Sequence, residues 1–175
     1  MNRSMLAGVI GGLVIFVWGA FSHMVLPLGG MGLDSLPNEA AVVSALSASI
    51  PRAGLYMFPA DENATTGPWG MVNFHPDEPS TITTRRLVRE LLGDIAAAVI
   101  AVLILSRSSL TRRGLVVAAA AMGLFGWFSI SFPYWNWYGF PAAFVLSEAI
   151  DQAVGWALAG AAMSFLITTR ARSVK

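Results

Sequence analysis

Residues 86–98 read RLVRELLGDIAAA, and residues 144–155 read FVLSEAIDQAVG. Each stretch belongs to an apolar segment of membrane-crossing length, yet each carries two carboxylates: Glu90 and Asp94 in the first, Glu148 and Asp151 in the second. A charged side chain near the centre of a membrane helix costs about 2.5–3.5 kcal/mol on insertion scales. Four acids in such segments therefore predict a polar site that the protein itself encloses.

The overall composition is typical of a membrane protein. Of 175 residues, 55% are hydrophobic and only 12% are charged, which sets the chain apart from an average soluble domain. The net charge of +1 provides no basic surface, so nucleic acid is not an expected partner. Because the chain has no cysteine, disulfides, thiolate metal sites and cysteine nucleophiles are excluded.

Four apolar segments are long enough to cross a hydrocarbon core of about 30 Å, which takes roughly 20 helical residues. They are residues 5–26, 87–105, 115–132 and 142–168, and Pro27, Pro133 and Pro141 mark three of their ends. This order predicts an all-α integral membrane protein with a single domain over residues 1–175. We expect an antiparallel bundle of four transmembrane helices, in which the third span is the shortest and the fourth is the longest.

The placement of arginine and lysine predicts the orientation. Basic residues gather at the N-terminus, in the loop after the second span and in the tail, whereas the opposite side has fewer: Arg52, Arg85 and Arg86, with Arg89 at the membrane boundary. The positive-inside rule then places both termini in the cytoplasm. The expected location is a bacterial cytoplasmic membrane, with the lipid bilayer as a partner.

Residues 28–84 are predicted to form an extracytoplasmic loop domain between the first two spans. Pro37 and Asn38 favour the start of a short helix that ends before Pro51, and this helix is expected to lie along the membrane interface or to cap the bundle. Residues 54–59 and 67–76 read as two short strands that could pair. Residues 134–140, YWNWYGF, are predicted to form the other external loop, at headgroup depth.

Helical spacing gathers the polar residues of the spans into one candidate site. Residues three or four apart share a face of a helix, and at about 1.5 Å per residue the acids of both spans lie at similar depth in the outer half of the membrane. His23 lies near the same end of the first span. The predicted polar, ligand-binding network consists of Arg86, Arg89, Glu90, Asp94, Glu148, Asp151 and Gln152.

The charge balance of this site leaves several interpretations open. Arg86 and Arg89 can pair with carboxylates, but the acids outnumber them, so a proton, water, another basic side chain or a bound cation must neutralise the rest. One interpretation is a satisfied salt-bridge network that fixes helix register. Others are proton or cation conduction, binding of a polar substrate or lipid headgroup, and a divalent-metal site. That metal site would be built from His23, Glu90, Asp94, Glu148 and Asp151.

The sequence favours a binding or structural function over catalysis. There is no Walker loop, GxSxG or HExxH motif, and no catalytic residue is predicted. With two histidines in the chain, one of them in a loop, haem is not an expected cofactor. We expect a non-enzymatic accessory subunit of a membrane complex or a small-ligand binder; the alternative is a metal-dependent membrane enzyme or a proton- or cation-translocating unit. The Gly8/Gly12 spacing favours a homo-oligomer or contact with other membrane subunits.

Overall fold

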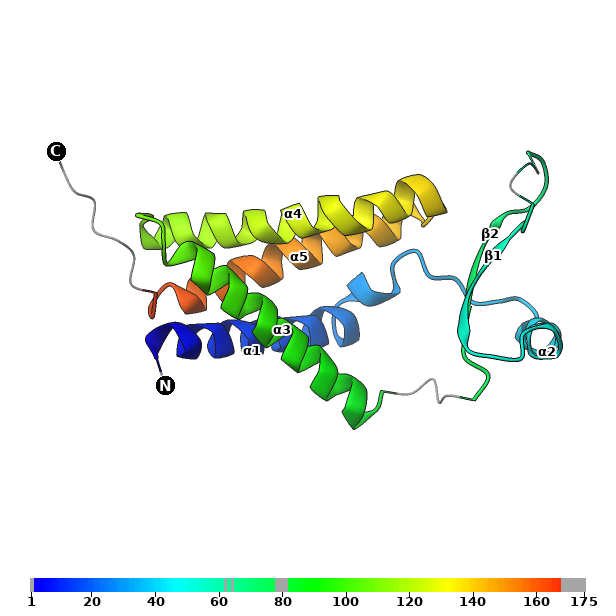
Figure 1. Cartoon of the computed structure of the whole chain (residues 1–175), viewed down its shortest axis with the longest axis horizontal. Helices are drawn as coiled ribbons and strands as arrows, with labels where there is room; N and C mark the ends of the chain where they lie inside the picture. Colours follow the sequence, from blue (N-terminus) through cyan, green and yellow to red (C-terminus); the bar gives the residue numbers. More distant parts are fainter. Residues whose placement is uncertain (1, 62, 64, 78–81, 168–175) are drawn as a thin grey trace.

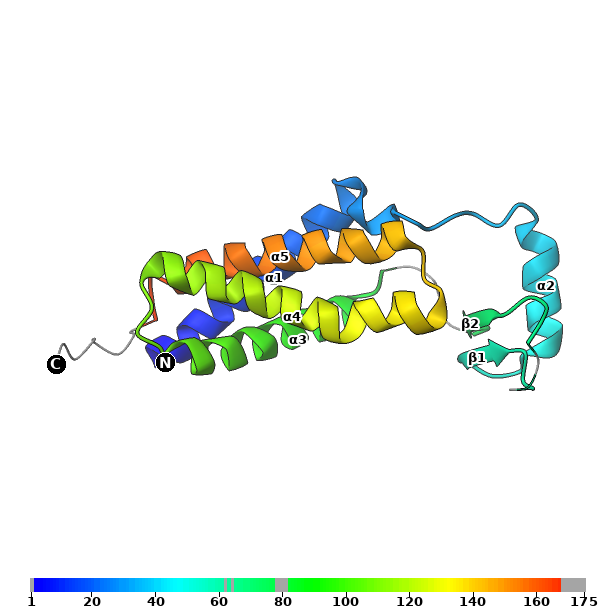
Figure 2. The same cartoon turned by 90° about the horizontal axis from the view of Figure 1, so that it is seen from above.

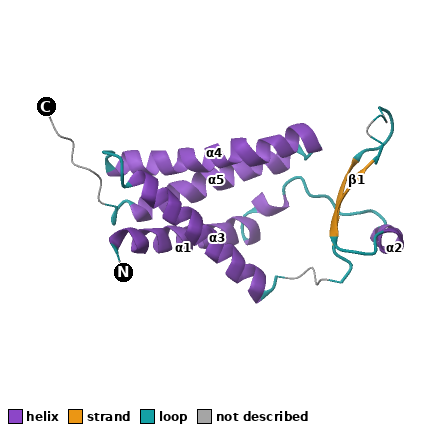
Figure 3. Ribbon diagram, viewed as in Figure 1, coloured by secondary structure: helices purple, strands orange, loops and turns teal. Residues whose placement is uncertain are grey.

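The computed structural model describes residues 2–61, 63, 65–77 and 82–167. This part of the chain is mostly helical, and a small sheet accompanies the helices (Figure 3). The elements in chain order are α1 (Arg3–Met24), the 3-10 turn η1 (Pro27–Gly30), α2 (Glu39–Ser49), β1 (Gly54–Phe58), β2 (Gly70–Phe74), α3 (Thr84–Leu105), α4 (Arg112–Tyr138) and α5 (Ala142–Met163). The predicted helical character is confirmed, and the all-α class needs correction for the two strands.

The four long helices form an open arrangement rather than a closed bundle. α1 packs between α3 and α5, and α4 packs on α5, whereas α3 and α4 make few contacts with each other. Figure 1 shows α3 crossing the other helices obliquely, so that its N-terminal half points away from them, and Figure 2 shows α4 and α5 running side by side while α1 crosses them obliquely. The N-terminal half of α3 is therefore attached to the molecule mainly through α1.

Glycines bring α1 close to its two neighbours. A Cβ atom on Gly12 would lie 2.5 Å from Cα of Ile95 in α3, and one on Gly11 would lie 2.5 Å from Sδ of Met163 in α5. The core beside them consists of small and medium side chains: Ala7, Ala98, Val102, Ala159 and Met163. The small-residue face of α1 thus packs against α3 and α5 of the same chain. Such spacing is expected to allow this close approach of helices.

Two of the long helices, α1 and α4, are long and apolar enough to cross a membrane. The other two carry more polar residues. α3 has five charged side chains in its N-terminal half, and Glu148, Asp151 and Gln152 interrupt the apolar run of α5. The described residues therefore show two candidate membrane-spanning helices, judged by length and composition, and the four predicted spans go beyond that finding.

Two predicted helix ends are wrong. α4 continues through Pro133 to Tyr138, with 27 residues, so it is the longest helix rather than the shortest, and residues 134–138 are not a loop. Ring pairs along this turn, Phe132–Trp135 and Tyr134–Tyr138, have centroids 5.4 and 5.9 Å apart, in a helix that lacks the one hydrogen bond that a proline cannot make. α5 ends at Met163 and not at residue 168.

The segment between η1 and α3 contains the predicted helix and strand pair. Asn38 caps α2 by accepting a hydrogen bond from the Ala41 N–H at 3.3 Å, and β1 pairs antiparallel with β2, with Tyr56 opposite Val72. No residue of α2 is buried, and both views place α2 and the sheet beyond the end of the long helices (Figure 2). α2 does not cap the bundle; its position along a membrane interface stays a prediction.

Candidate functional site

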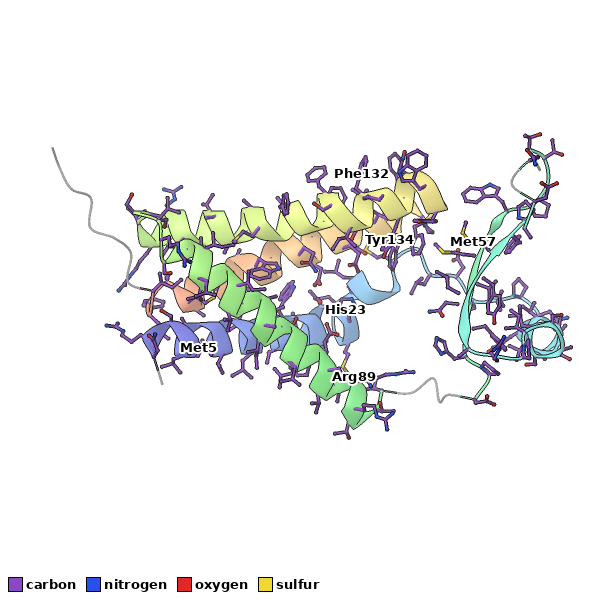
Figure 4. All side chains as sticks on the ribbon, viewed as in Figure 1. Met5, His23, Met57, Arg89, Phe132 and Tyr134 are labelled. Atoms are coloured by element: carbon purple, nitrogen blue, oxygen red, sulfur yellow. The ribbon has the colours of Figure 1, made fainter. Side chains whose placement is uncertain are left out.

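A pocket of about 490 Å³ lies between α1, α3 and α5, and α4 contributes no residue to its described lining. The pocket contains every residue of the predicted polar network except Arg89. Its polar lining consists of His23 from α1, Arg86, Glu90 and Asp94 from α3, and Glu148, Asp151 and Gln152 from α5. Figure 4 shows His23 at the end of α1 and Arg89 on the N-terminal half of α3. Three helices far apart in sequence thus place these side chains around one cavity.

The acids form two walls of this pocket. Glu90 and Asp94 are one helical turn apart on α3, and Glu148 and Asp151 are nearly one turn apart on α5. Each pair consists of like charges that interact within its own helix. The two walls therefore bring four carboxylates to one pocket. The basic side chains in the same lining are Arg86 and His23.

Asp151 is the acid that is least satisfied within the described residues. Its Oδ1 atom is buried and has no hydrogen-bond partner there, while its backbone carbonyl accepts a hydrogen bond from Trp18 Nε1 at 3.2 Å. A buried polar atom without a partner is costly and rare in folded proteins. Asp151 Oδ1 is therefore the buried side-chain oxygen of this pocket whose hydrogen-bonding capacity the described residues leave unused.

Two tryptophans line the same pocket, and each is held by a hydrogen bond to α5. Trp18 donates to the Asp151 carbonyl, and Trp156 Nε1 donates to Gln152 Oε1 at 3.2 Å. Glycines make room for both rings: a Cβ on Gly155 would lie 2.7 Å from Trp18 Cδ1, and one on Gly123 would lie 2.6 Å from Trp156 Cδ1. The two indoles are therefore fixed parts of the pocket wall.

His23 is oriented by its own helix. Its Nδ1 lies 3.0 Å from the Gly19 carbonyl oxygen and 2.9 Å from Ser22 Oγ. Because a carbonyl oxygen only accepts, the Nδ1 atom carries the proton in this geometry, and Nε2 is available on the other side of the ring. His23 is also an electrostatic neighbour of Glu148, so this α1 side chain lies close to the α5 wall of the pocket.

The geometry does not support the predicted metal site. No three histidine or acidic side chains among the described residues converge closely enough to hold a metal ion. The proposed ligands His23, Glu90, Asp94, Glu148 and Asp151 share the pocket but are distributed along its walls. Such an arrangement attracts positive charge over an extended region rather than at a single point.

The sequence identified the acids of this pocket but not its aromatic residues. Trp156 lies four residues after Gln152, so helical spacing alone places it on the acidic face of α5. Trp18 carries a weaker signal, because its place in the pocket depends on Gly155 of another helix. Trp156 could therefore have been found from the sequence, whereas Trp18 could be assigned only once the packing of α1 on α5 was known.

No family model, curated protein or solved structure matches the chain. The chemistry of the pocket is therefore the basis for a function. That chemistry consists of four acids on two facing walls, a buried carboxylate oxygen without a partner in the described residues, and two oriented indoles.

Proposed function

We propose that the protein is a non-enzymatic integral membrane protein in which α1, α3, α4 and α5 all span the bilayer. α1, α3 and α5 have 22 residues each and α4 has more, so each is at least about 33 Å long at about 1.5 Å per residue. A hydrocarbon core of about 30 Å needs no more than that. Large apolar side chains on their outer faces, such as Ile100 at 58% and Phe125 at 73% exposure, suit contact with lipid.

The acids of α3 and α5 are compatible with this topology because they line an internal pocket. Ionisable residues within membrane helices almost always face the protein interior or a water-filled cavity. The basic residues at the α3–α4 loop, Arg107, Arg112 and Arg113, favour a cytoplasmic location for that loop and for both termini. The segment with α2 and the sheet is then extracytoplasmic.

Cysteine labelling tests this topology directly, because the natural chain has no cysteine. We expect Ser44→Cys, in the exposed α2, to react with a membrane-impermeant maleimide in intact cells. Ser109→Cys, in the exposed α3–α4 loop, should react only after the membrane is permeabilised. Labelling of both variants in intact cells, or of neither after permeabilisation, would contradict the four-span arrangement.

Within that topology, we propose that the pocket binds a small ligand. The observation that carries this proposal is the pocket itself: about 490 Å³, with a buried Asp151 oxygen that has no partner among the described residues. A volume of this size falls in the usual range of small-molecule sites. A salt-bridge network that serves only to fix helix register would be expected to satisfy its buried oxygens.

A thermal-stability screen tests the binding function. The full chain in lipid nanodiscs would be heated with small amphipathic compounds of three classes: cationic, neutral and anionic. Because a ligand that binds the folded state stabilises it by mass action, at least one class should raise the melting temperature, and substituting Asp151 should reduce the effect. If no compound of any class raises it, the proposed binding function is wrong.

A further inference from the structure

We propose that the ligand of this pocket is a small organic cation with an apolar body, an inference that rests on the proposed binding function. The acidic walls would hold the positive charge, and the indoles of Trp18 and Trp156 would cover the apolar part. The structure offers separate observations for the charge, the aromatic surface and the size of such a ligand.

The charge follows from the lining of the pocket. Glu90 and Asp94 face it from α3, Glu148 and Asp151 from α5, and the basic groups that face it are Arg86 and His23. The acids outnumber the basic groups, so an anionic ligand would meet net repulsion and a cation would be attracted. Asp151 supplies one of the two carboxylates on the α5 wall.

The dispersion of the acids favours an organic cation over a metal ion. A metal ion needs several ligands at about 2.0–2.6 Å, and no such group of three occurs among the described histidine and acidic residues. The pocket volume of about 490 Å³ is far larger than a bare ion requires. An ammonium group with carbon substituents instead spreads its charge over a surface that several distant carboxylates can approach.

The two indoles supply the surface that such a cation prefers. Tryptophan is the best of the aromatic side chains at attracting a cation to its ring face. Hydrogen bonds from both indole N–H groups to α5 hold the rings in place, and Gly155 and Gly123 provide the space behind them. Because the ring orientation is fixed before binding, little side-chain entropy is lost when the ligand arrives.

Trp18 also connects the acidic pocket with an apolar groove. It lines a second cavity of about 480 Å³ together with Ile10, Leu13, Val14, Val17, Phe21 and Leu158. The Trp18 indole therefore lies between the acidic pocket and the apolar groove. This position fits a ligand that carries a charged group and an apolar group at once.

A pair of isosteric probes separates charge from hydrophobicity. Benzyltrimethylammonium and neopentylbenzene have the same shape, and only the first is charged. Binding of each to the full chain in nanodiscs would be measured by calorimetry, with empty nanodiscs to correct for partitioning into lipid and manganese chloride as a metal probe. We expect saturable binding of benzyltrimethylammonium, at least about tenfold tighter than that of neopentylbenzene, and no competition by manganese.

Matched variants then assign the binding to the pocket. Asp151→Asn should weaken benzyltrimethylammonium binding about tenfold or more by removing a negative charge from the pocket wall, whereas Asp34→Asn, at an exposed acid outside the pocket, should leave it unchanged. Trp18→Leu should weaken binding by about 3- to 30-fold through loss of the ring face, whereas Trp137→Leu, at a tryptophan that is 74% exposed, should have no effect.

The outcomes distinguish the ligand class from the binding function. If neutral or anionic compounds stabilise the protein but benzyltrimethylammonium does not bind, the pocket binds a ligand and the cation proposal is overturned. Manganese binding that displaces the ammonium probe would replace the organic cation with a metal ion. Equal affinities for the two isosteres, or equal losses in the Asp151 and Asp34 variants, would also overturn the proposal.

Discussion

Asp151 and Gln152 are sequence neighbours on α5 whose polar side chains are in opposite situations. The Gln152 amide oxygen accepts a hydrogen bond from Trp156 Nε1, so that side chain supports the pocket wall. Asp151 Oδ1 is buried without a partner in the described part of the chain, which is a costly arrangement for a polar atom. Two adjacent residues of one pocket thus differ in whether their polar atoms are satisfied, and we propose that only Gln152 has a purely structural role.

Leucine substitutions at these two positions should therefore change stability in opposite directions. We expect Asp151→Leu to raise the free energy of unfolding of the ligand-free protein by about 1 kcal/mol or more, because an unsatisfied buried oxygen is removed. Gln152→Leu should lower it by about 1 kcal/mol, because the Trp156 N–H loses its acceptor. Unfolding in nanodiscs or detergent measures both; a loss of stability in Asp151→Leu would favour the register-fixing network instead.

The position of the acids was predictable at the residue scale, and their environment was not. Spacing of three and four residues places Glu90 with Asp94, and Glu148 with Asp151, on single helix faces whatever the tertiary structure. The missing partner of Asp151 and the support of Trp18 by Gly155 depend on how α1 crosses α5. No local pattern contains that crossing.

At the scale of elements, the glycines of α1 decide how closely α3 approaches. A Cβ on Gly12 would lie 2.5 Å from Cα of Ile95, which is backbone and cannot move aside, whereas a Cβ on Gly93 of α3 would meet nothing within 4 Å. We expect Gly12→Ala to destabilise the protein by about 1–3 kcal/mol through forced separation of the helices. Gly93→Ala should be neutral or stabilising by up to about 1 kcal/mol, because alanine favours the helix. Denaturant titration of the two variants provides the comparison.

The contact between α4 and α5 depends on a buried tryptophan. Trp127 Nε1 donates to the Val145 carbonyl at 2.7 Å, and its side chain is 9% exposed. Trp127→Phe should lower the free energy of unfolding by about 1–3 kcal/mol, because a buried carbonyl loses its donor and a smaller ring leaves space. Trp137→Phe, on the same helix but 74% exposed, is the matched control and should be neutral. Equal effects would mean that α4 is not held to α5 by this bond.

The element boundaries show which signals of the sequence were ambiguous. The apolar lengths located all four long helices, and Asn38 correctly predicted the start of α2. Pro133 was misleading, because a proline interrupts one hydrogen bond but does not prevent a helix whose aromatic residues pack along the following turn. Gly139, with φ of +68°, is the residue that ends α4.

At the scale of the whole molecule, the open order α3–α1–α5–α4 creates the pocket. A closed bundle would bring α3 against α4 and fill the space that the acidic walls face. The number of helices followed from the sequence, but their order did not, because each helix has small residues that suit more than one neighbour. The glycine contacts of α1 with both α3 and α5 resolve that ambiguity in the structure.

The same arrangement predicts that the segment between η1 and α3 is dispensable for the pocket. α2 buries no residue, and from Ser35 to Asp77 the described residues supply none of the pocket lining. Replacing residues 35–77 with a flexible glycine–serine linker should therefore leave the affinity for benzyltrimethylammonium nearly unchanged, and should affect the melting temperature of the long helices only through loss of the Trp69 contact with Gly139 at the end of α4.

Gly32→Ala is the contrasting variant, because it affects the anchor of η1 on the bundle. Gly32 has φ of +76°, and its Cβ would lie 2.8 Å from the Phe144 N atom of α5, so alanine there should lower the melting temperature through backbone strain and steric conflict. If excision lowers the stability and Gly32→Ala does not, the prediction is wrong, and the outer segment rather than the turn at Gly32 supports the long helices. The pocket lies between α1, α5 and α3. The affinity for benzyltrimethylammonium, measured on the same samples, therefore shows whether the loss of stability in Gly32→Ala also weakens binding in the pocket.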